Sequence, residues 1–293
     1  MKQNISRILL IAIILLAFQY TYAQNKLPKI YLNHLYIVLD STTYNQLFDP
    51  IFISENFGDI KTSSHKTTTD SWSGKYLYGK NGYFEFFSTK SYAGATLGDC
   101  GLGFMTSKSD DILKVERNWK KSSSDSLGKD TSLYIFENKP QPWFYSLYIL
   151  RKDSLQPLST WLMENTPELL KSTGFKDDEI KKEIKWQDFM ARKTKVEFTK
   201  SFNRIKSIDL SLNKKEYEFF KKSLLGFGLQ QKGNIYFNNQ IKISYTIDDN
   251  VPVRLKTVET ELTEVYPEST IRISKNLVVD VNGKKAVWNF TYY

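Results

Sequence analysis

One order of predicted elements, a strand followed by a helix and then a pair of strands, recurs along this chain and constrains its fold more than any other feature. The first copy begins with an apolar segment at residues 30–39, continues through a helix that starts near Thr43, and ends in a hairpin that turns at Asn81-Gly82. Asn-Gly between apolar runs is a strong hairpin signal. The segments GLGFMTSK, SDDILKVERNWKK, SLYIFEN and WFYSLYILR repeat this order. Such internal repetition predicts assembly from similar units.

The order returns a third time near the end of the chain. FNRIKSIDLSL predicts a strand, NKKEYEFFKKSLLGFG a helix, and NIYFNNQIKISYTI a hairpin that turns at Asn238-Asn239. At least three further strands are expected to follow, and the last two are expected to join at Asn282-Gly283. The repeated units are therefore expected at residues 30–152 and 199–293.

The stretch between these units has a different pattern. Residues 153–198 have helical spacing and few β-branched residues, which predicts a helical insertion. Leu158, Trp161 and Leu162 would form the apolar stripe of one helix. The simplest interpretation is a helix that packs against the sheet, without a role for Trp161 in ligand binding.

Residues 1–23 have the anatomy of a secretory signal peptide. Two cationic residues, Lys2 and Arg7, precede an apolar run, and small residues allow cleavage after Ala23. The run is shorter than the roughly 20 residues that span a bilayer, and no later segment approaches that length. We expect a protein exported to the periplasm or the medium, which is not an integral membrane protein after processing.

Charge and cysteine content exclude several classes of protein. The formal charge of +9 comes from lysines scattered among acidic residues, so nucleic-acid binding is not predicted. The single cysteine, Cys100, cannot form an intrachain disulfide, and we expect it to be buried in a hydrophobic core. The chain has no nucleophile-elbow, phosphate-loop or H-E-x-x-H zinc motif.

The segments LNHLYIVLDSTTYNQLF, SWSGKYLYGKNGYFEFF and GLGFMTSKSDDI resemble the vicinal oxygen chelate superfamily. This superfamily includes glyoxalase I, extradiol dioxygenases, bleomycin-resistance proteins, and glyoxalase-like domains of exported bacterial proteins. The resemblance implies repeated βαβββ modules whose curved mixed sheets surround a cleft. It is best over residues 32–150, extends in unit order to 204–293, and does not cover the helical insertion.

The resemblance also implies a metal site, of which this chain holds only part. His34 matches the histidine ligand on the first strand, and Glu85 matches the glutamate ligand on the last strand of the first module. Leu102 stands at the third ligand position, and the fourth falls in a strand without His, Glu or Asp. His65, in a polar loop, is the candidate third ligand. Because metals such as zinc need three or four such ligands, we expect no cofactor and keep a divalent metal as the alternative.

His34 and Glu85 could act without a metal. Across adjacent strands they could form a hydrogen-bonded acid/base pair, in which the carboxylate fixes the imidazole tautomer and raises its pKa. Such a base could abstract a proton next to a carbonyl group. The alternative is structural, because burying either group alone would be costly, and the pair could satisfy itself inside the module.

Aromatic residues surround the same positions. Alternation along a strand places Tyr83, Glu85 and Phe87 on one face, and Tyr36 shares a face with His34. A cleft bordered by these residues would suit a flat or amphipathic small molecule, although alternate aromatics also occur in packed cores. The expected ligand-binding residues are Tyr36, Trp72, Tyr83 and Tyr148.

Three functions are consistent with this reading of the sequence. The first is an exported glyoxalase-like protein that binds a small molecule. The second is a lyase or isomerase of the vicinal oxygen chelate type that uses His34 and Glu85. The third is a structural envelope protein with a filled cleft.

Overall fold

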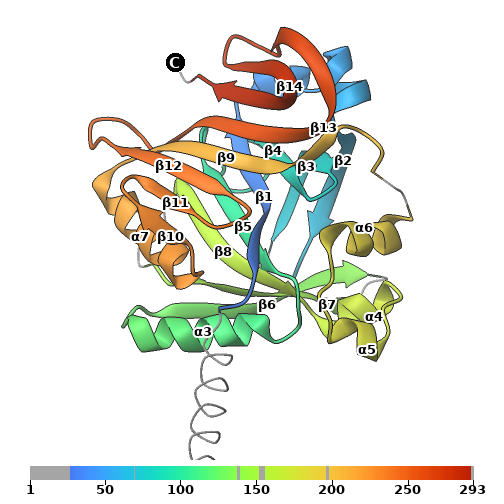
Figure 1. Cartoon of the computed structure of the whole chain (residues 1–293), viewed down its shortest axis with the longest axis vertical. Helices are drawn as coiled ribbons and strands as arrows, with labels where there is room; N and C mark the ends of the chain where they lie inside the picture. The colour runs from blue at the N-terminus through green and yellow to red at the C-terminus, as the bar shows by residue number, and fades with distance from the viewer. Residues whose placement is uncertain (1–26, 69, 137–138, 152–155, 196–197, 292–293) are drawn as a thin grey trace, which may run out of the picture.

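The computed structural model describes residues 27–291 apart from 69, 137–138, 152–155 and 196–197 (Figure 1). The protein is a mixed α+β structure made mostly of strands, which form two mixed sheets. The expected signal peptide at residues 1–23 lies outside the described residues, so export remains a prediction. Among the helices that the structure describes, none combines the length and apolar character needed to cross a membrane.

The first sheet has eight strands in the spatial order β2-β3-β4-β1-β5-β8-β7-β6. Its strands are β1 (Ile30–Leu39), β2 (Asp59–Lys66), β3 (Ser71–Gly79), β4 (Gly82–Ser88), β5 (Cys100–Thr106), β6 (Leu127–Phe136), β7 (Lys139–Ile149) and β8 (Leu158–Asn165). β1 runs parallel to β4, and β5 runs parallel to β8, whereas the other neighbours are antiparallel. The central pair is β1 and β5.

This first sheet curls into a half-barrel. Its two edge strands, β2 and β6, lie at opposite ends of the spatial order. Even so, Thr67, which follows β2, forms an isolated antiparallel bridge with Tyr134 of β6. The two edges of the sheet therefore touch at this bridge, and the curled sheet has a concave face.

The second sheet has six strands in the order β10-β11-β12-β9-β13-β14 and lies across the first sheet (Figure 1). Its strands are β9 (Phe202–Leu212), β10 (Gln230–Lys232), β11 (Ile235–Phe237), β12 (Lys242–Ile247), β13 (Arg254–Arg272) and β14 (Leu277–Phe290). β9 runs parallel to β12 and antiparallel to β13.

The described residues form seven helical segments between these strands. They are α2 (Ser41–Gln46), the π-helical turn η1 (Phe52–Phe57), α3 (Asp111–Ser122), α4 (Pro167–Ser172), α5 (Asp177–Ile180), α6 (Trp186–Thr194) and α7 (Lys214–Gly226). The helices expected near Thr43, after residue 109 and after residue 213 are confirmed. Asp40 and Asn213 cap α2 and α7, because each side chain accepts a backbone N–H of the first turn.

The expected helix at the start of the 153–198 segment is wrong. Leu158–Asn165 is strand β8, which pairs with β5 on one side and β7 on the other. Leu158 and Leu162 are four residues apart, and this spacing places two side chains on one face of a helix and equally on one face of a strand. Both are buried, while Trp161 points to the other face. The rest of the segment contains the short helices α4, α5 and α6.

The hairpin expected at Asn282-Gly283 is also wrong. β13 and β14 are long strands that turn at residues 273–276, and Gly283 lies inside β14 opposite Tyr266. The strand register shifts beside this pair, and Gly283 has φ +60°. Glycine adopts this conformation without steric cost, so the Asn-Gly pair forms a bulge in the strand instead of a turn.

The main hydrophobic core lies between the two sheets. Phe84 of β4 stacks on Phe202 of β9 at 5.5 Å between ring centroids, and Trp288 of β14 lies 5.2 Å from Phe84. All three side chains are fully buried. One face of the first sheet therefore packs on the second sheet, and its concave face is left for other contacts.

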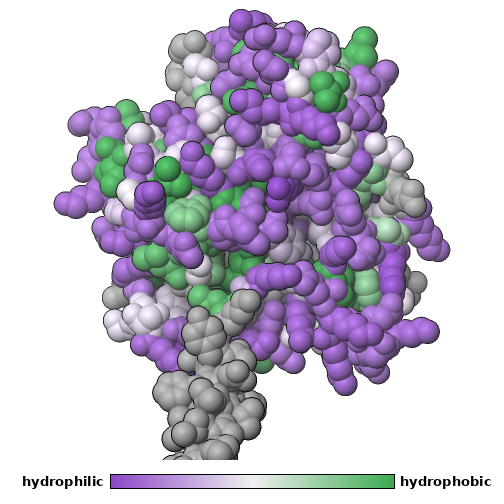
Figure 2. All heavy atoms as spheres, in the orientation of Figure 1, coloured by the Kyte–Doolittle hydropathy of each residue, from purple (hydrophilic) through white to green (hydrophobic). Residues whose placement is uncertain are grey.

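The surface is mainly polar on the face shown in Figure 2. Hydrophilic side chains cover most of it, and hydrophobic ones occur in small separate groups.

Cys100 is fully buried, as expected, and burial raises the pKa of its thiol to about 12.

Candidate functional site

A cavity of about 990 Å³ lies on the concave face of the first sheet, and we call it the sheet cavity. Strands β1, β3, β4, β5, β7 and β8 contribute to its walls, and α6 covers one side. Ten of the lining side chains are aromatic. The lining residues are Asn33, His34, Tyr36, Asp70, Ser71, Trp72, Tyr83, Glu85, Phe87, Tyr92, Ala93, Met105, Trp143, Phe144, Gln156, Ser159, Trp161, Met163, Asn165, Trp186, Phe189 and Lys193.

The alternation of side chains along β4 explains how its residues reach the cavity. Tyr83, Glu85 and Phe87 line the cavity, whereas Phe84 and Phe86 are fully buried in the core between the sheets. The sequence predicted this division correctly, because successive side chains of a strand point to opposite faces.

Two glycines of β5 make space for the rings on β1. Gly101 pairs with Tyr36, and Gly103 pairs with His34. A Cβ atom on Gly101 would lie 2.8 Å from the Trp161 ring, inside van der Waals contact. Side chains at these two positions would therefore displace the rings that form the floor of the cavity.

Leu102, which stands at the position of a third metal ligand, does not face the cavity. It pairs with Leu35 between the two glycines of β5, and both leucines are fully buried in the core. The third ligand position is thus occupied by a core residue on the opposite face of the sheet.

His34 is buried and held by its neighbours. Its ring stacks on Tyr83 at 4.7 Å between centroids and meets Trp161 edge-on at 5.3 Å. Its Nδ1 lies 3.1 Å from the side-chain oxygen of Asn33, which accepts a hydrogen bond when Nδ1 carries the proton. Burial lowers the pKa of His34 to about 3, so the ring is neutral at physiological pH.

Glu85 borders the cavity and is half-buried. Burial raises the pKa of its carboxyl group to about 7, and a hydrogen bond from Tyr83 acts in the opposite direction. Within the described part of the chain, no hydrogen bond or ion pair joins Glu85 to His34. Both residues line the same cavity, but the expected acid/base pair is not formed. The carboxyl group alone is poised to exchange a proton near neutral pH.

His65 lies on strand β2 and not in a polar loop as expected. Its Nε2 is 2.9 Å from the Ser63 hydroxyl, and its ring packs near Trp72 and Trp143, behind the cavity wall. Considering only the residues that the structure describes, no three His, Cys, Asp or Glu side chains are grouped to hold a metal ion. The donors present therefore do not fit the metal site of the vicinal oxygen chelate enzymes.

Three of the four expected ligand-binding residues, Tyr36, Trp72 and Tyr83, line the cavity. Tyr148 does not. It lies opposite Gly128 of β6, and its hydroxyl donates to Asp130. It lies near the end of β7, away from Trp143 and Phe144, which are the residues of that strand that line the cavity. The role of all four residues in binding remains a prediction.

Several lining residues could not be assigned from the sequence. Trp143 of β7 lies parallel to Trp72 of β3 at 6.4 Å between centroids, and Trp186 of α6 stacks on Tyr83 at 5.3 Å. Trp161 is a cavity residue because its segment is a strand. The alternating pattern Ser159, Trp161, Met163 is the sequence signal that could have indicated this.

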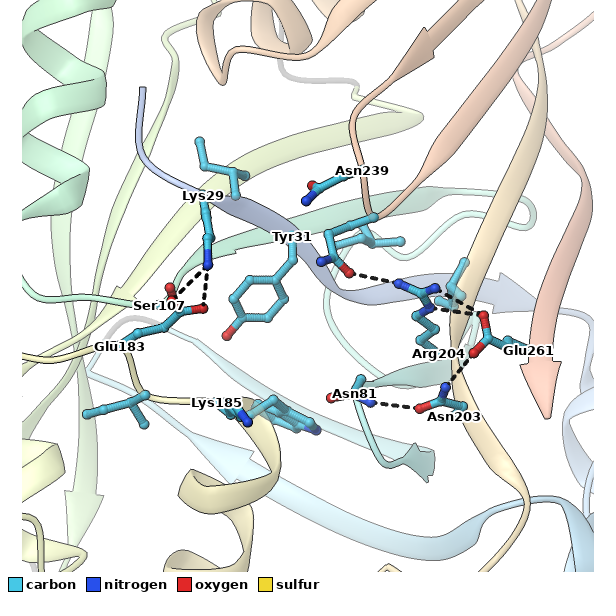
Figure 3. A pocket seen from close by; sticks show the side chains of 16 residues that line it. Lys29, Tyr31, Asn81, Ser107, Glu183, Lys185, Asn203, Arg204, Asn239 and Glu261 are labelled. Carbon is cyan, nitrogen blue, oxygen red and sulfur yellow. Dashed lines mark hydrogen bonds and ion pairs between the residues drawn. The ribbon is translucent and has the colours of Figure 1, made fainter. Parts of the chain in front are cut away.

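A second hollow of about 330 Å³ lies where the two sheets meet (Figure 3). Lys29 and Glu183 form an ion pair of 2.9 Å on one side of Tyr31, and Arg204 pairs with Glu261 on the other. These charged groups neutralise one another within the protein.

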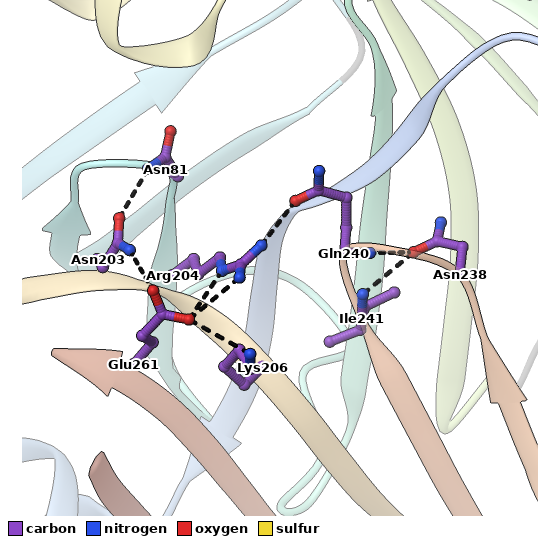
Figure 4. A network of polar contacts seen from close by, with 8 residues as sticks. All are labelled: Asn81, Asn203, Arg204, Lys206, Asn238, Gln240, Ile241 and Glu261. Carbon is purple, nitrogen blue, oxygen red and sulfur yellow. Dashed lines mark hydrogen bonds and ion pairs between the residues drawn. The ribbon is translucent and has the colours of Figure 1, made fainter. Parts of the chain in front are cut away.

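The polar network beside this hollow connects the sheets (Figure 4). Asn81 of the β3–β4 turn donates to Asn203 of β9 at 2.7 Å, and Asn203 donates to Glu261 of β13 at 2.7 Å. Arg204 extends the network to Gln240 at 2.9 Å. Because the polar groups of this network are hydrogen-bonded to one another, we interpret it as a structural contact between the two sheets. The sheet cavity is therefore the candidate functional site.

Comparison with known proteins identifies the family of this chain and a solved structure with a similar fold. A model described as a family of unknown function, DUF5829, matches residues 32–290. No curated protein matches the sequence significantly. The crystal structure of a hypothetical protein from Staphylococcus aureus is similar, with a TM-score of 0.51 and 12% identity over 84% of this chain and 96% of that chain. At this identity the likeness concerns the fold alone.

Proposed function

This chain belongs to the DUF5829 family, whose function is unknown, and we propose that it binds a small aromatic or amphipathic molecule in the sheet cavity. The cavity itself carries the proposal. Its volume of about 990 Å³ suits a small organic molecule, and ten aromatic side chains line it beside a few polar groups. Ligand sites of proteins are typically concave and mostly apolar in this way.

We further propose that the sheets are built from repeated βαβββ modules like those of the vicinal oxygen chelate superfamily. In the stretches β1 to β4, β5 to β8 and β9 to β12, helical structure follows the first strand, and the first strand pairs in parallel with the last. The helical structure is α2 with η1 in the first stretch, α3 in the second and α7 in the third. Such modules surround a cleft in that superfamily. The signal-like residues 1–23 support the proposal that binding takes place outside the cytoplasm.

The open space argues against a purely structural protein with a filled cleft. Protein interiors are close-packed, with few voids larger than a water molecule. Here the rings of Trp72 and Trp143 lie parallel across the wall, and neither fills the space beside it. A cavity of this size leaves room for a bound small molecule.

Intrinsic fluorescence can test the proposal, because four tryptophans border the cavity. The purified protein would be titrated with a set of small aromatic compounds, and binding would be checked by calorimetry. Trp72→Ala should weaken binding by about tenfold through loss of stacking area. The matched control is Tyr148→Ala, an aromatic residue of the same sheet outside the cavity, which should leave the affinity unchanged. Equal effects of the two substitutions would contradict the proposed site.

One observation favours a second function, that of a metal-free lyase or isomerase. A carboxyl group with a pKa near 7 that lines a cavity suits a general base. In that case Glu85 abstracts a proton from the bound molecule, and neutral His34 beside it contributes only packing and orientation. Glu85→Gln would then abolish turnover while binding of the substrate persists.

A further inference from the structure

We infer that the ligand of the sheet cavity is an organic cation whose positive charge lies against the Glu85 carboxylate, among the aromatic rings. This inference rests on the proposed binding function and names the class of molecule bound. This class of organic cations includes molecules with ammonium groups and charged nitrogen heterocycles.

The first argument is the missing counter-charge of Glu85. Its carboxylate accepts a hydrogen bond from Tyr83, and it forms no ion pair with any lysine, arginine or histidine within the described ranges. Carboxylates that border a cavity without a cationic partner carry a desolvation cost that an incoming cation can offset. When this carboxyl group is ionised, the site thus holds a negative charge that no cationic side chain of the described residues neutralises.

The titratable groups that face Glu85 do not supply that counter-charge. Burial first, and the Glu85 carboxylate second, raise the pKa values of Tyr76, Tyr78 and Tyr83. These phenols therefore stay neutral near pH 7. His34 on β1 is neutral as well, because burial lowers its pKa to about 3. Around the carboxylate the protein provides uncharged rings and hydroxyl groups.

The second argument is the arrangement of the rings. Tyr83, next to Glu85 on the strand, lies between His34 at 4.7 Å and Trp186 at 5.3 Å. Trp161 completes this wall from β8. The faces of aromatic rings carry partial negative charge, so a set of rings around a carboxylate attracts a cation, and quaternary ammonium groups above all.

At the rim of the cavity, a cationic group of the protein itself already lies against aromatic rings. The Lys193 ammonium lies 5.6 Å from the centre of the Trp143 ring and 5.5 Å from that of Phe189, and both rings line the cavity. Loss of hydration beside the protein is the main cause that lowers the pKa of Lys193 to about 8, and the positive charge of Lys61 is the second. Lys193 is exposed to solvent, so its side chain can move away from the rings when another cation enters.

The remaining charged and titratable groups of the lining do not supply the counter-charge either. Asp70 is at the rim and has partners within its own turn. Burial raises the pKa values of the phenols of Tyr36 and Tyr92, which therefore stay neutral. Glu85 beside the wall and Lys193 at the rim are thus the described lining groups expected to change charge between about pH 7 and 8.

Three small probes of similar size can test the inference by calorimetry. Phenyltrimethylammonium is a cation, tert-butylbenzene is its uncharged isostere, and benzenesulfonate is an anion. At a pH of about 8.5 the cation should bind roughly tenfold or more tightly than the isostere. Its affinity should fall as the pH decreases through 7, because Glu85 becomes protonated. Binding of the isostere should not change with pH.

Two variants separate the contribution of Glu85 from that of the rim. Glu85→Gln keeps the shape of the side chain and should remove both the preference for the cation and its pH dependence, while the isostere still binds. Lys193→Met should retain the pH dependence near 7, because the responsible group is still present. Loss of this dependence in Lys193→Met would overturn the assignment to Glu85.

The outcomes distinguish the two proposals. If the isostere binds as tightly as the cation, or benzenesulfonate binds most tightly, the cavity is a ligand site and the inference of a cationic ligand is overturned. If none of the probes binds to protein that circular dichroism shows to be folded, the proposed binding function itself is overturned together with the inference.

Discussion

Gly103 lies directly beneath the imidazole of His34, so that a Cβ atom on this glycine would come within 2.8 Å of the His34 Nδ1. The two residues are partners in the antiparallel pair β1 and β5. The buried ring of His34 can lie flat over β5 only because position 103 has no side chain. This relationship shapes the floor of the cavity, and it is the basis of the first prediction.

Gly103→Ala should push the His34 ring away from Tyr83 and Trp161. We expect a decrease of about 1–3 kcal/mol in the free energy of unfolding, which is typical of overpacking, and weaker binding of ligands. Urea denaturation followed by circular dichroism measures the first effect. Gly233→Asn is the matched control, because its surroundings are open and asparagine tolerates its φ of +59°. A Gly103→Ala variant as stable as the control would show that the floor is not closely packed.

The stability of the protein should depend on pH through Glu85. In the folded protein burial raises the pKa of this carboxyl group from 4.5 to about 7, so the folded state binds the proton more tightly than the unfolded chain. The stabilisation from this group is therefore complete below pH 4.5 and is lost as the pH rises through 7. Between these values the free energy of unfolding should fall by up to about 1.4 kcal/mol per pH unit.

Comparison with Glu85→Gln isolates this contribution from the other titrating groups. The difference in unfolding free energy between the wild type and the variant should decrease from pH 4.5 to 7 and become constant above about pH 8. Urea denaturation at a series of pH values measures it. A difference that stays constant over the whole range would mean that the Glu85 carboxyl group titrates as it does in water.

The sequence predicted the local pattern of this fold well, and the cavity in part. The Asn81-Gly82 hairpin and the division of β4 into core and cavity faces follow from turn chemistry and a period of two residues. The strand that contains Trp161 did not follow, because a spacing of four residues suits a helix and a strand equally. Its pairing with β5 and β7 decides between them, and such contacts between distant segments leave no local signal.

Contacts between distant segments also decide which residues of α6 cover the cavity. The sequence indicates only that Trp186 belongs to a helical stretch, and its stacking on Tyr83 depends on where α6 packs. The residues that face the cavity from one strand were therefore predictable, whereas those that close it from a distant helix were not.

A buried ion pair should contribute strongly to stability at the far end of β7. Arg151 donates to both carboxylate oxygens of Glu216 on α7, at 2.8 and 2.6 Å, and both side chains are almost completely buried. Glu216→Gln removes the carboxylate that accepts both of these hydrogen bonds from the guanidinium. We expect the free energy of unfolding to fall by about 3–5 kcal/mol, because removing one partner of a buried ion pair is costly.

The double variant Arg151→Met, Glu216→Leu tests the reason for this loss. It removes both charges and fills the same space, so it should be more stable than the single variant Glu216→Gln. Thermal unfolding of the three proteins provides the comparison. If the double variant were the least stable, packing and hydrogen bonding around the pair would matter more than the imbalance of charge in the single variant.

Cys100 should be inert to thiol reagents in the native protein. Its side chain is fully buried at the start of β5, and burial raises the pKa of the thiol to about 12, so little thiolate exists at neutral pH. Labelling by a disulfide reagent should be on the order of 100-fold or more slower in the native protein than in denaturant, because it requires β5 to open. Cys100→Ala is the control for reaction at other groups.

A ligand of the sheet cavity should slow the labelling further, since β5 forms part of the cavity wall and binding stabilises the closed sheet. Rapid labelling of the native protein would mean instead that the centre of the first sheet opens easily.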